Sequence, residues 1–324
     1  MDGNEMSNAS QDQGWPDLSE LNRQDWAHAL RALVEQHGEF LDLDDDHQVI
    51  QMGEGERLLV TFESAHDIRN GQDDALPIGL KMAQELDVAV ITVMCQRPTW
   101  FRAPTVFAFF DALTDDGVFD SFEHVAFFGT GLGGYAAAAF SVSAPGCDVV
   151  VISPQATLDP RVTEWDPRFA SARRFSWTDR YGFAPEMAEA SRHTLILYNP
   201  EDDLEAMHVS LFAREGITRF RCRHMGRDVT GAMQDMRILN DTLRLSLAGV
   251  LGEASFARLY RKRRDYAPYL RTLLTETEDQ DRPKLTTWLA ESVLQRKNMP
   301  RMRRALERVQ KAAEASADAS EAAE

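Results

Sequence analysis

Residues 124–134 read His124-Val-Ala-Phe-Phe-Gly-Thr-Gly-Leu-Gly-Gly134. The run HVAFF at 124–128 is short and apolar, as in strands that are buried on both faces of a sheet. It leads directly into glycines at 129, 131, 133 and 134, and an Ala-rich helical segment then extends to about residue 142. A buried strand, a glycine-rich turn and a helix in direct succession are typical of an α/β protein.

Further apolar runs on both sides of this segment predict a larger sheet. They lie at 57–63, 87–95, 148–153, 193–198 and 217–223. Helical patterns separate them, and the clearest cover 73–84, 105–113 and 228–251. A polar loop is predicted at 64–72, before the first of these helices. Strands that alternate with helices indicate an α/β fold, a mostly parallel sheet with helices on both faces. Runs at 39–43 and 47–52, which follow a helical pattern over 18–37, alternate polar and apolar residues and predict outer antiparallel strands.

Charge is distributed unevenly over the 324 residues, which carry −17 in total. We expect a disordered N-terminus at 1–17, an α/β domain at 18–252, a basic helical appendage at 253–310 and an acidic low-complexity tail at 311–324. The appendage has 14 Lys or Arg and 8 Asp or Glu, hence a net charge of +6, whereas residues 1–252 carry −20. Because the appendage is short, we expect it to pack on the main domain.

Composition excludes several classes of protein. A charge of −17 argues against a chain that coats nucleic acid or anionic membrane, which both need a positive field. The first 20 residues lack the basic and apolar regions of a signal peptide, and no apolar run reaches the length of a membrane span. Cys95, Cys147 and Cys222 lack metal-site spacing and are expected to be buried free thiols. We therefore expect a soluble cytoplasmic protein with no cofactor and no metal.

Two kinds of site use a glycine-rich turn between a strand and a helix. In dinucleotide-binding proteins GxGxxG lets the backbone approach a pyrophosphate, and Gly129, Gly131 and Gly134 have that spacing. A nucleophile elbow has the pattern GxSxG, and Gly129, Gly131 and Gly133 have that spacing. Two buried strands precede the turn, and the strand at 148–153 continues into Ser-Pro-Gln without the acidic residue that would hold a ribose. The nucleophile-elbow pattern is therefore favoured.

An elbow predicts an acid after a later strand and a histidine after the last one. Asp202 and Asp203 follow the run at 193–198, and His224 follows the run at 217–223. In this order of motifs, residues 39–251 resemble the α/β-hydrolase superfamily. The resemblance implies a site at the carboxyl ends of the strands, with Asp202 and His224 as its acid and base. Each also has a structural interpretation, Asp202 as a turn residue and His224 as a solvated loop residue.

The departure from this family lies at Gly131, which stands where the nucleophile belongs and has no atom that could attack carbon. The sequence therefore favours a non-catalytic protein that binds a ligand or a partner in the crevice beside Gly131. The residues expected to line the crevice are Ser64, His66, Gly129, Thr130, Gly131 and Leu132. For the basic appendage, docking against the acidic body or simple solvation is favoured, and the alternative is a site for an acidic partner such as a protein surface, a phosphate or nucleic acid. No membrane partner is expected, and nucleic acid is the disfavoured choice for the protein as a whole.

Two enzymatic alternatives remain open at this point. One is a hydrolase or transferase of the same fold in which His224 and Asp202 act without a covalent intermediate. The weaker one is a nucleotide-binding enzyme of the sulfonucleotide (phosphoadenosine phosphosulfate) reductase type, although the chain has no SGGxD-type phosphate loop near its N-terminus and no terminal Cys motif.

Overall fold

A computed structural model describes residues 14–86 and 88–321 of the chain. Its centre is one eight-stranded sheet with the order β1-β2-β4-β3-β5-β6-β7-β8. The strands are β1 (Gly38–Asp42), β2 (His47–Met52), β3 (Arg57–Ser64), β4 (Ala89–Cys95), β5 (His124–Thr130), β6 (Asp148–Ile152), β7 (His193–Tyr198) and β8 (Ile217–Arg221). Strands β3 to β8 are parallel to one another, so the predicted α/β fold with a mostly parallel sheet is confirmed.

The two antiparallel strands differ from the prediction in one respect. β1 forms the edge of the sheet and pairs with β2. β2 also pairs with β4, so the prediction that both strands are outer is wrong for β2. Its polar residues His47 and Gln48 are buried, and His47 bonds Asp44 and Thr99. These hydrogen bonds allow an alternating polar pattern to occur in an interior strand.

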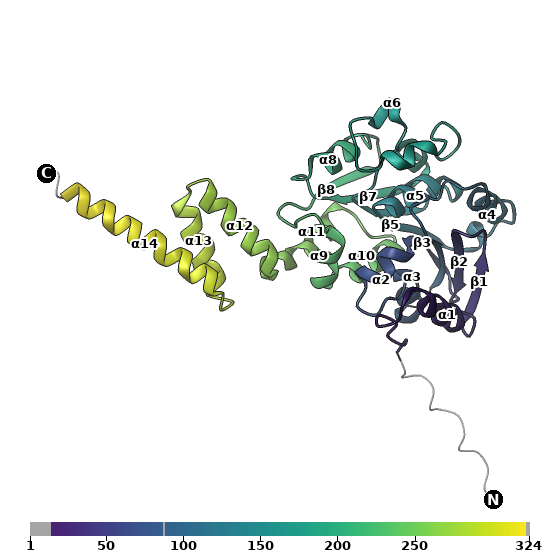
Figure 1. The fold of residues 1–324 in the computed structure, drawn as a ribbon, viewed down its shortest axis with the longest axis horizontal. Coiled ribbons are helices and arrows are strands. Elements are labelled where there is room, and N and C mark those ends of the chain that lie inside the picture. Colours follow the sequence, from purple (N-terminus) through teal and green to yellow (C-terminus); the bar gives the residue numbers. More distant parts are fainter. Residues whose placement is uncertain (1–13, 87, 322–324) are drawn as a thin grey trace, which may run out of the picture.

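Helices cover both faces of the sheet (Figure 1). The helices of the α/β domain are α1 (Arg23–Val34), α2 (Ala65–Gly71), α3 (Ile78–Glu85), α4 (Pro104–Asp115), α5 (Leu132–Phe140), α6 (Pro160–Thr163), α7 (Ala184–Met187), α8 (Asp203–Ser210), α9 (Val229–Asp235) and α10 (Leu239–Leu247). Alternate residues of β3 enter different cores: Val60 and Phe62 pack with α4 and α5, and Leu59 packs with α3, α9 and α10. This period of two is the side-chain alternation of a strand.

Several of the predicted helical boundaries are wrong, and the helix predicted over 73–84 begins only at Ile78. Residues 65–71 form α2 where a polar loop is predicted, because the Ser64 hydroxyl accepts the Asp67 N–H and caps the helix. The single helix predicted over 228–251 is divided into α9 and α10, and Arg237 between them has a left-handed φ of 53°. Most of the N-terminal segment predicted to be disordered, residues 1–13, lies outside the described residues, and residues 14–17 form neither helix nor strand.

The C-terminal helical region is present and comprises α11 (Glu253–Leu259), a 3-10 helix (Tyr260–Asp265), α12 (Ala267–Asp279), α13 (Pro283–Leu294) and α14 (Pro300–Glu321). Phe256 and Tyr260 belong to the core of the α/β domain. Beyond them, α12, α13 and α14 share a separate core of Leu270, Leu274, Ala290, Val293, Met302 and Ala305. This three-helix unit projects from the main body (Figure 1), so the expectation that the appendage packs on the main domain is correct only for α11, the 3-10 helix and part of α12, whose Tyr269 packs on that core.

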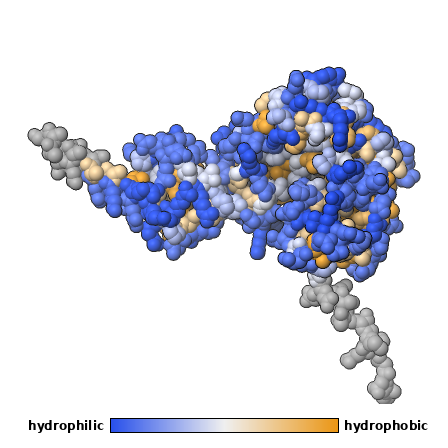
Figure 2. All heavy atoms as spheres, viewed as in Figure 1, coloured by the Kyte–Doolittle hydropathy of each residue, from blue (hydrophilic) through white to orange (hydrophobic). Residues whose placement is uncertain are grey.

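On the face that Figure 2 shows, the three-helix unit is mostly hydrophilic. The segment predicted as a low-complexity tail begins within α14, which continues to Glu321. Among the described residues, no helix has both the length and the apolar character needed to cross a bilayer.

Candidate functional site

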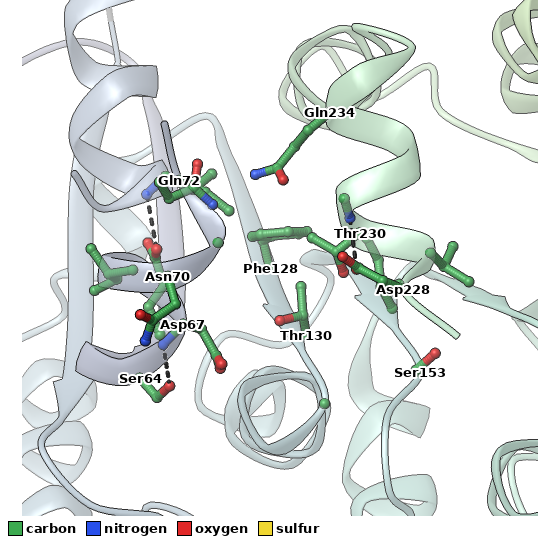
Figure 3. Close-up of a pocket in the computed structure, with 18 of the residues that line it drawn as sticks. Ser64, Asp67, Asn70, Gln72, Phe128, Thr130, Ser153, Asp228, Thr230 and Gln234 are labelled. Carbon is green, nitrogen blue, oxygen red and sulfur yellow. Dashed lines mark hydrogen bonds between the residues drawn. The ribbon is translucent and has the colours of Figure 1, made fainter. Parts of the chain in front are cut away.

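A cavity of about 390 Å³ opens at the carboxyl ends of β3, β5 and β6. Helix α2 forms one wall with Asp67 and Asn70, and α9 forms the opposite wall with Thr230 and Gln234 (Figure 3). Phe128 and Thr130 of β5 lie between these walls. The cavity occupies the position at which ligands bind to open parallel sheets.

Gly131 lies in this cavity, at the turn from β5 into α5. Its φ of 51° and ψ of −117° are accessible to glycine and strained for other residues. A Cβ added to Gly131 would have no atom within 4 Å. The turn therefore has room for a side chain at Gly131, the central glycine of the GxGxG spacing.

The neighbouring glycines have a packing role. A Cβ at Gly129 would lie 2.1 Å from the Gly133 carbonyl oxygen, and one at Gly133 would lie 2.1 Å from the Phe62 carbonyl oxygen. At Gly134 the nearest atoms would be backbone oxygens at 3.2 and 3.3 Å. These glycines let α5 pack closely against β3 and β5, which is a different use from cradling a pyrophosphate.

Of the other residues expected to line the crevice, Ser64 and Thr130 line the cavity. The Ser64 hydroxyl is committed to capping α2. His66 is exposed on α2 and contacts Asn70, and it is not among the residues that line the cavity. Leu132 is half-buried against the core beneath α5. The crevice is therefore built mainly from the ends of strands and from α2 and α9.

Asp202 and His224 have different partners. The Asp202 carboxylate caps α8 by accepting the Glu205 N–H at 3.2 Å. His224 Nδ1 lies 3.0 Å from Oε2 of Glu276, which is on α12 of the appendage. Neither residue is among those that line the cavity beside Gly131. The structure therefore does not join Asp202 to His224 as a triad acid is joined to its base.

A second histidine–aspartate pair lies within the body. His208 Nε2 is 3.0 Å from Asp166 Oδ2, and its Nδ1 accepts the Ala156 N–H at 3.3 Å. Both side chains are fully buried. Burial lowers the pKa of His208 to about 4, against the opposing effect of Asp166, so the imidazole is neutral at neutral pH. With both nitrogens bonded and no access to solvent, the pair serves packing and not proton transfer.

Several cavity residues were missed by the sequence analysis: Asp67, Asn70, Ser153, Asp228, Thr230 and Gln234. Ser153 follows β6 and has a φ of 49°, which is rare outside glycine. The sequence carries a signal for Ser153, since a strand that ends in Ser-Pro places a hydroxyl at the carboxyl edge of the sheet. The α9 residues carry no such signal, because their approach to α2 depends on the tertiary fold.

The electrostatics of the cavity are acidic to neutral. Asp67 and Asp228 are exposed at its walls, and Arg227 at the rim is 94% exposed. Glu63 is buried at its edge, where desolvation raises the pKa of the carboxyl although the Ile78 and Gly79 N–H groups and the Thr61 hydroxyl bond it. The cavity therefore offers hydroxyls, amides and carboxylates to a polar ligand.

Within residues 14–86 and 88–321, no group of three or more His, Cys, Asp or Glu is arranged to hold a metal ion. Asp44 and Asp46 of the acidic turn before β2 instead bond His47 and Arg97 respectively. The three cysteines are buried free thiols, and burial raises the pKa of each thiol to about 12.

Comparison with known proteins gave solved structures only. No family model matches the chain, and no curated protein matches it. Similar solved structures include an arylesterase, at 15% identity over 72% of this chain and 93% of that chain, with a TM-score of 0.45. Est1E from Butyrivibrio proteoclasticus has 8% identity over 65% of this chain and 99% of that chain, with a TM-score of 0.42. The capsule O-acetyltransferase of Neisseria meningitidis serogroup A has 10% identity over 63% of this chain and 94% of that chain, with a TM-score of 0.41.

The fold follows from the features of the chain itself. Six parallel strands continue an antiparallel pair, and a tight turn at Gly131 leads from β5 into α5 at the carboxyl edge of the sheet. The chain therefore has the fold of the α/β-hydrolase superfamily.

Proposed function

We propose that this protein is a non-catalytic member of its fold, which binds a small polar ligand in the cavity beside Gly131. The observation that carries the proposal is the geometry of Gly131. The turn has the φ and ψ of a strained strand-to-helix elbow and open space for a side chain, but the residue supplies no nucleophile.

The surroundings of the turn support the same proposal. A covalent mechanism also needs a base beside the nucleophile and an acid that orients the base. His224 is paired with Glu276, and Asp202 caps α8. Helix α5 begins at Leu132 without a side-chain cap, so its first backbone N–H groups have no side-chain partner.

The chemistry of the cavity indicates the class of ligand. Hydroxyls of Thr130, Ser153 and Thr230 and the amides of Asn70 and Gln234 supply donors and acceptors. Two carboxylates, from Asp67 and Asp228, disfavour an anion, and the cation at the rim is almost fully exposed. We therefore propose a neutral or cationic ligand that has several hydrogen-bond donors.

Labelling with a fluorophosphonate probe tests the absence of catalysis. We expect no covalent adduct on the wild-type protein and no turnover of p-nitrophenyl esters. Adduct formation on Ser153 or Thr130, located by mass spectrometry, or ester hydrolysis that is lost in His224→Ala, would overturn the proposal. The same measurements on Gly131→Ser test whether a nucleophile alone restores reactivity, and with Asp202 and His224 held elsewhere we expect none.

Thermal shift measurements test the ligand class. Neutral polyols and small amines are expected to raise the midpoint of unfolding, and Gly131→Val should abolish the shift because its side chain enters the cavity. A shift produced by adenine nucleotides and lost in Gly129→Val would instead support the nucleotide-binding alternative and contradict a ligand without phosphate.

A further inference from the structure

We infer that α14 of the appendage binds the acidic edge of the α/β domain of a second copy, so that the chain associates head to tail. This inference is independent of the ligand in the cavity. It rests on two oppositely charged surfaces that are both exposed, and that one copy of the chain does not bring together.

The first surface is a stripe of cations on α14. Arg301, Arg304, Arg308 and Lys311 follow one another at spacings of three and four residues, which places them on one face of a helix. All four are exposed, and at about 1.5 Å per residue the stripe is about 15 Å long. Met302 and Ala305 on another face of α14 are fully buried in the core of the three-helix unit, which fixes the orientation of the stripe.

Most of this charge is not neutralised within the described chain. Arg308 pairs with Glu278 of α12. Arg301 donates to the Thr275 hydroxyl, and Arg304 to the Pro300 carbonyl, and neither forms an ion pair among the described residues. Because the three-helix unit projects from the body (Figure 1), the acidic body of the same copy leaves the stripe open to a partner.

The second surface, here called the acidic edge, lies at the amino ends of β3 and β5. It comprises six exposed carboxylates, those of Glu54, Glu56, Asp115, Asp116, Asp120 and Glu123. The Glu123 N–H donates to the Glu56 carbonyl at 2.7 Å, so the segments before β3 and β5 are adjacent. In the described part of the chain, no ion pair engages these six residues. One cation, Arg57, lies beside them.

The acidic edge also has a concave part. Asp120 and Glu123 line a hollow of about 260 Å³ together with Phe122 and His124. A hollow bordered by carboxylates suits the planar guanidinium of arginine, which can donate two parallel hydrogen bonds to one carboxylate. In Figure 1, α4, whose last residue is Asp115, lies at the end of the body away from the appendage.

A second copy is the partner that these charges favour. Each copy carries one surface of each sign, so a head-to-tail contact satisfies the stripe of one copy and the acidic edge of the next. Contact between the two local surfaces is decided within a Debye length of about 10 Å at 0.1 M salt, so the net charge of −17 on each copy does not prevent it. The association is expected to be weak and dependent on salt, because its charge pairs are exposed.

Sedimentation velocity on the full chain tests the inference. At about 20 mM NaCl the average mass should rise with concentration from 36.5 kDa towards at least about twice that value, and at about 500 mM NaCl it should stay at 36.5 kDa. R301E/R304E should remove the rise, whereas R219E/R221E should keep it. The control pair lies on β8, is exposed, and makes the same change in net charge.

Exchange of charge between the two surfaces identifies the partner surface. E56K/E123K should be monomeric alone, as should R301E/R304E, but a mixture of the two should associate because each offers a complement to the other. A mixture that stays monomeric would overturn the inference, as would equal loss of association in R219E/R221E. Binding of duplex DNA or of phosphatidylserine vesicles through Arg301 and Arg304, without self-association, would also overturn it and would assign the stripe to another partner.

Discussion

His224 Nδ1 lies 3.0 Å from the Glu276 carboxylate, and this contact joins the loop after β8 to helix α12 of the appendage. The same loop continues into Arg227 and Asp228, which line the cavity beside Gly131. The histidine that follows the last strand of the sheet thus contacts the appendage. Tyr266 adds a second link, since its hydroxyl donates to Asp235 at 2.8 Å.

The first prediction concerns this link. Glu276→Gln should increase hydrogen exchange in the loop at 222–226 and in α12, because the pairing of His224 with a carboxylate is lost. The free energy of unfolding should fall by less than about 1 kcal/mol, since the Glu276 side chain is 41% exposed. Hydrogen exchange read by mass spectrometry measures the first effect, and urea unfolding measures the second.

Glu278→Gln is the matched control for that experiment. Glu278 lies two residues further along α12 and pairs with Arg308 inside the three-helix unit. Its substitution should leave exchange in the loop at 222–226 unchanged. If Glu276→Gln also leaves that loop unchanged, the contact does not anchor the appendage.

The second prediction ranks substitutions in the glycine-rich turn. Gly131→Ala should cost about 1–3 kcal/mol, because its Cβ meets open space and only the strained φ and ψ are unfavourable. Gly133→Ala should be far more damaging, since its Cβ would lie 2.1 Å from the carbonyl oxygen of Phe62 in the interior of the sheet. Urea unfolding of the two variants measures the difference, and equal stabilities would show that α5 can move away from β3.

This turn also shows how much of the fold and of the site can be predicted from the sequence. Strands such as 57–63 and 193–198 are predictable because runs buried on both faces are continuously apolar. The order of the motifs predicts the fold and the crevice beside Gly131. It could not reveal that Glu276, 52 residues beyond His224, contacts the His224 imidazole. A contact between distant segments leaves no local pattern in the sequence. Likewise, His47 and Gln48 look like outer residues until their hydrogen bonds to Thr99 and Gln96 are known.

The third prediction concerns the separate core of the appendage. Leu274 is fully buried between α12, α13 and α14, so Leu274→Ala should destabilise the three-helix unit by about 2–4 kcal/mol. Trp288 on α13 is 65% exposed, and Trp288→Ala should change stability by less than about 0.5 kcal/mol. Hydrogen exchange should rise in α12–α14 of the first variant and stay slow in β3 and β5. Simultaneous loss of protection in the sheet would instead mean that the two cores unfold as one.

The fourth prediction is a dependence of stability on pH that arises from His208. Its pKa is lowered from 6.5 in the unfolded chain to about 4 in the folded protein, so the unfolded state binds more protons between these values. The contribution of His208 to the free energy of unfolding is fully present above pH 6.5 and is lost as the pH falls towards 4. The full loss is about 3 kcal/mol at 1.36 kcal/mol per pKa unit.

His208→Gln isolates that contribution, because glutamine keeps a polar group in the site and does not titrate between pH 4 and 6.5. The variant should be less stable than the wild type at pH 7, since it disturbs the bonds to Asp166 and Ala156. The difference between the two proteins should shrink as the pH falls, because only the wild type must keep an imidazole unprotonated. His66→Gln, a change to an exposed residue on α2, should follow the wild-type profile throughout. Urea unfolding at pH 4.5, 5.5 and 7 measures all three proteins. A constant difference between His208→Gln and the wild type would mean that the folded protein accommodates a protonated His208, although the new proton on Nδ1 would face the Ala156 N–H.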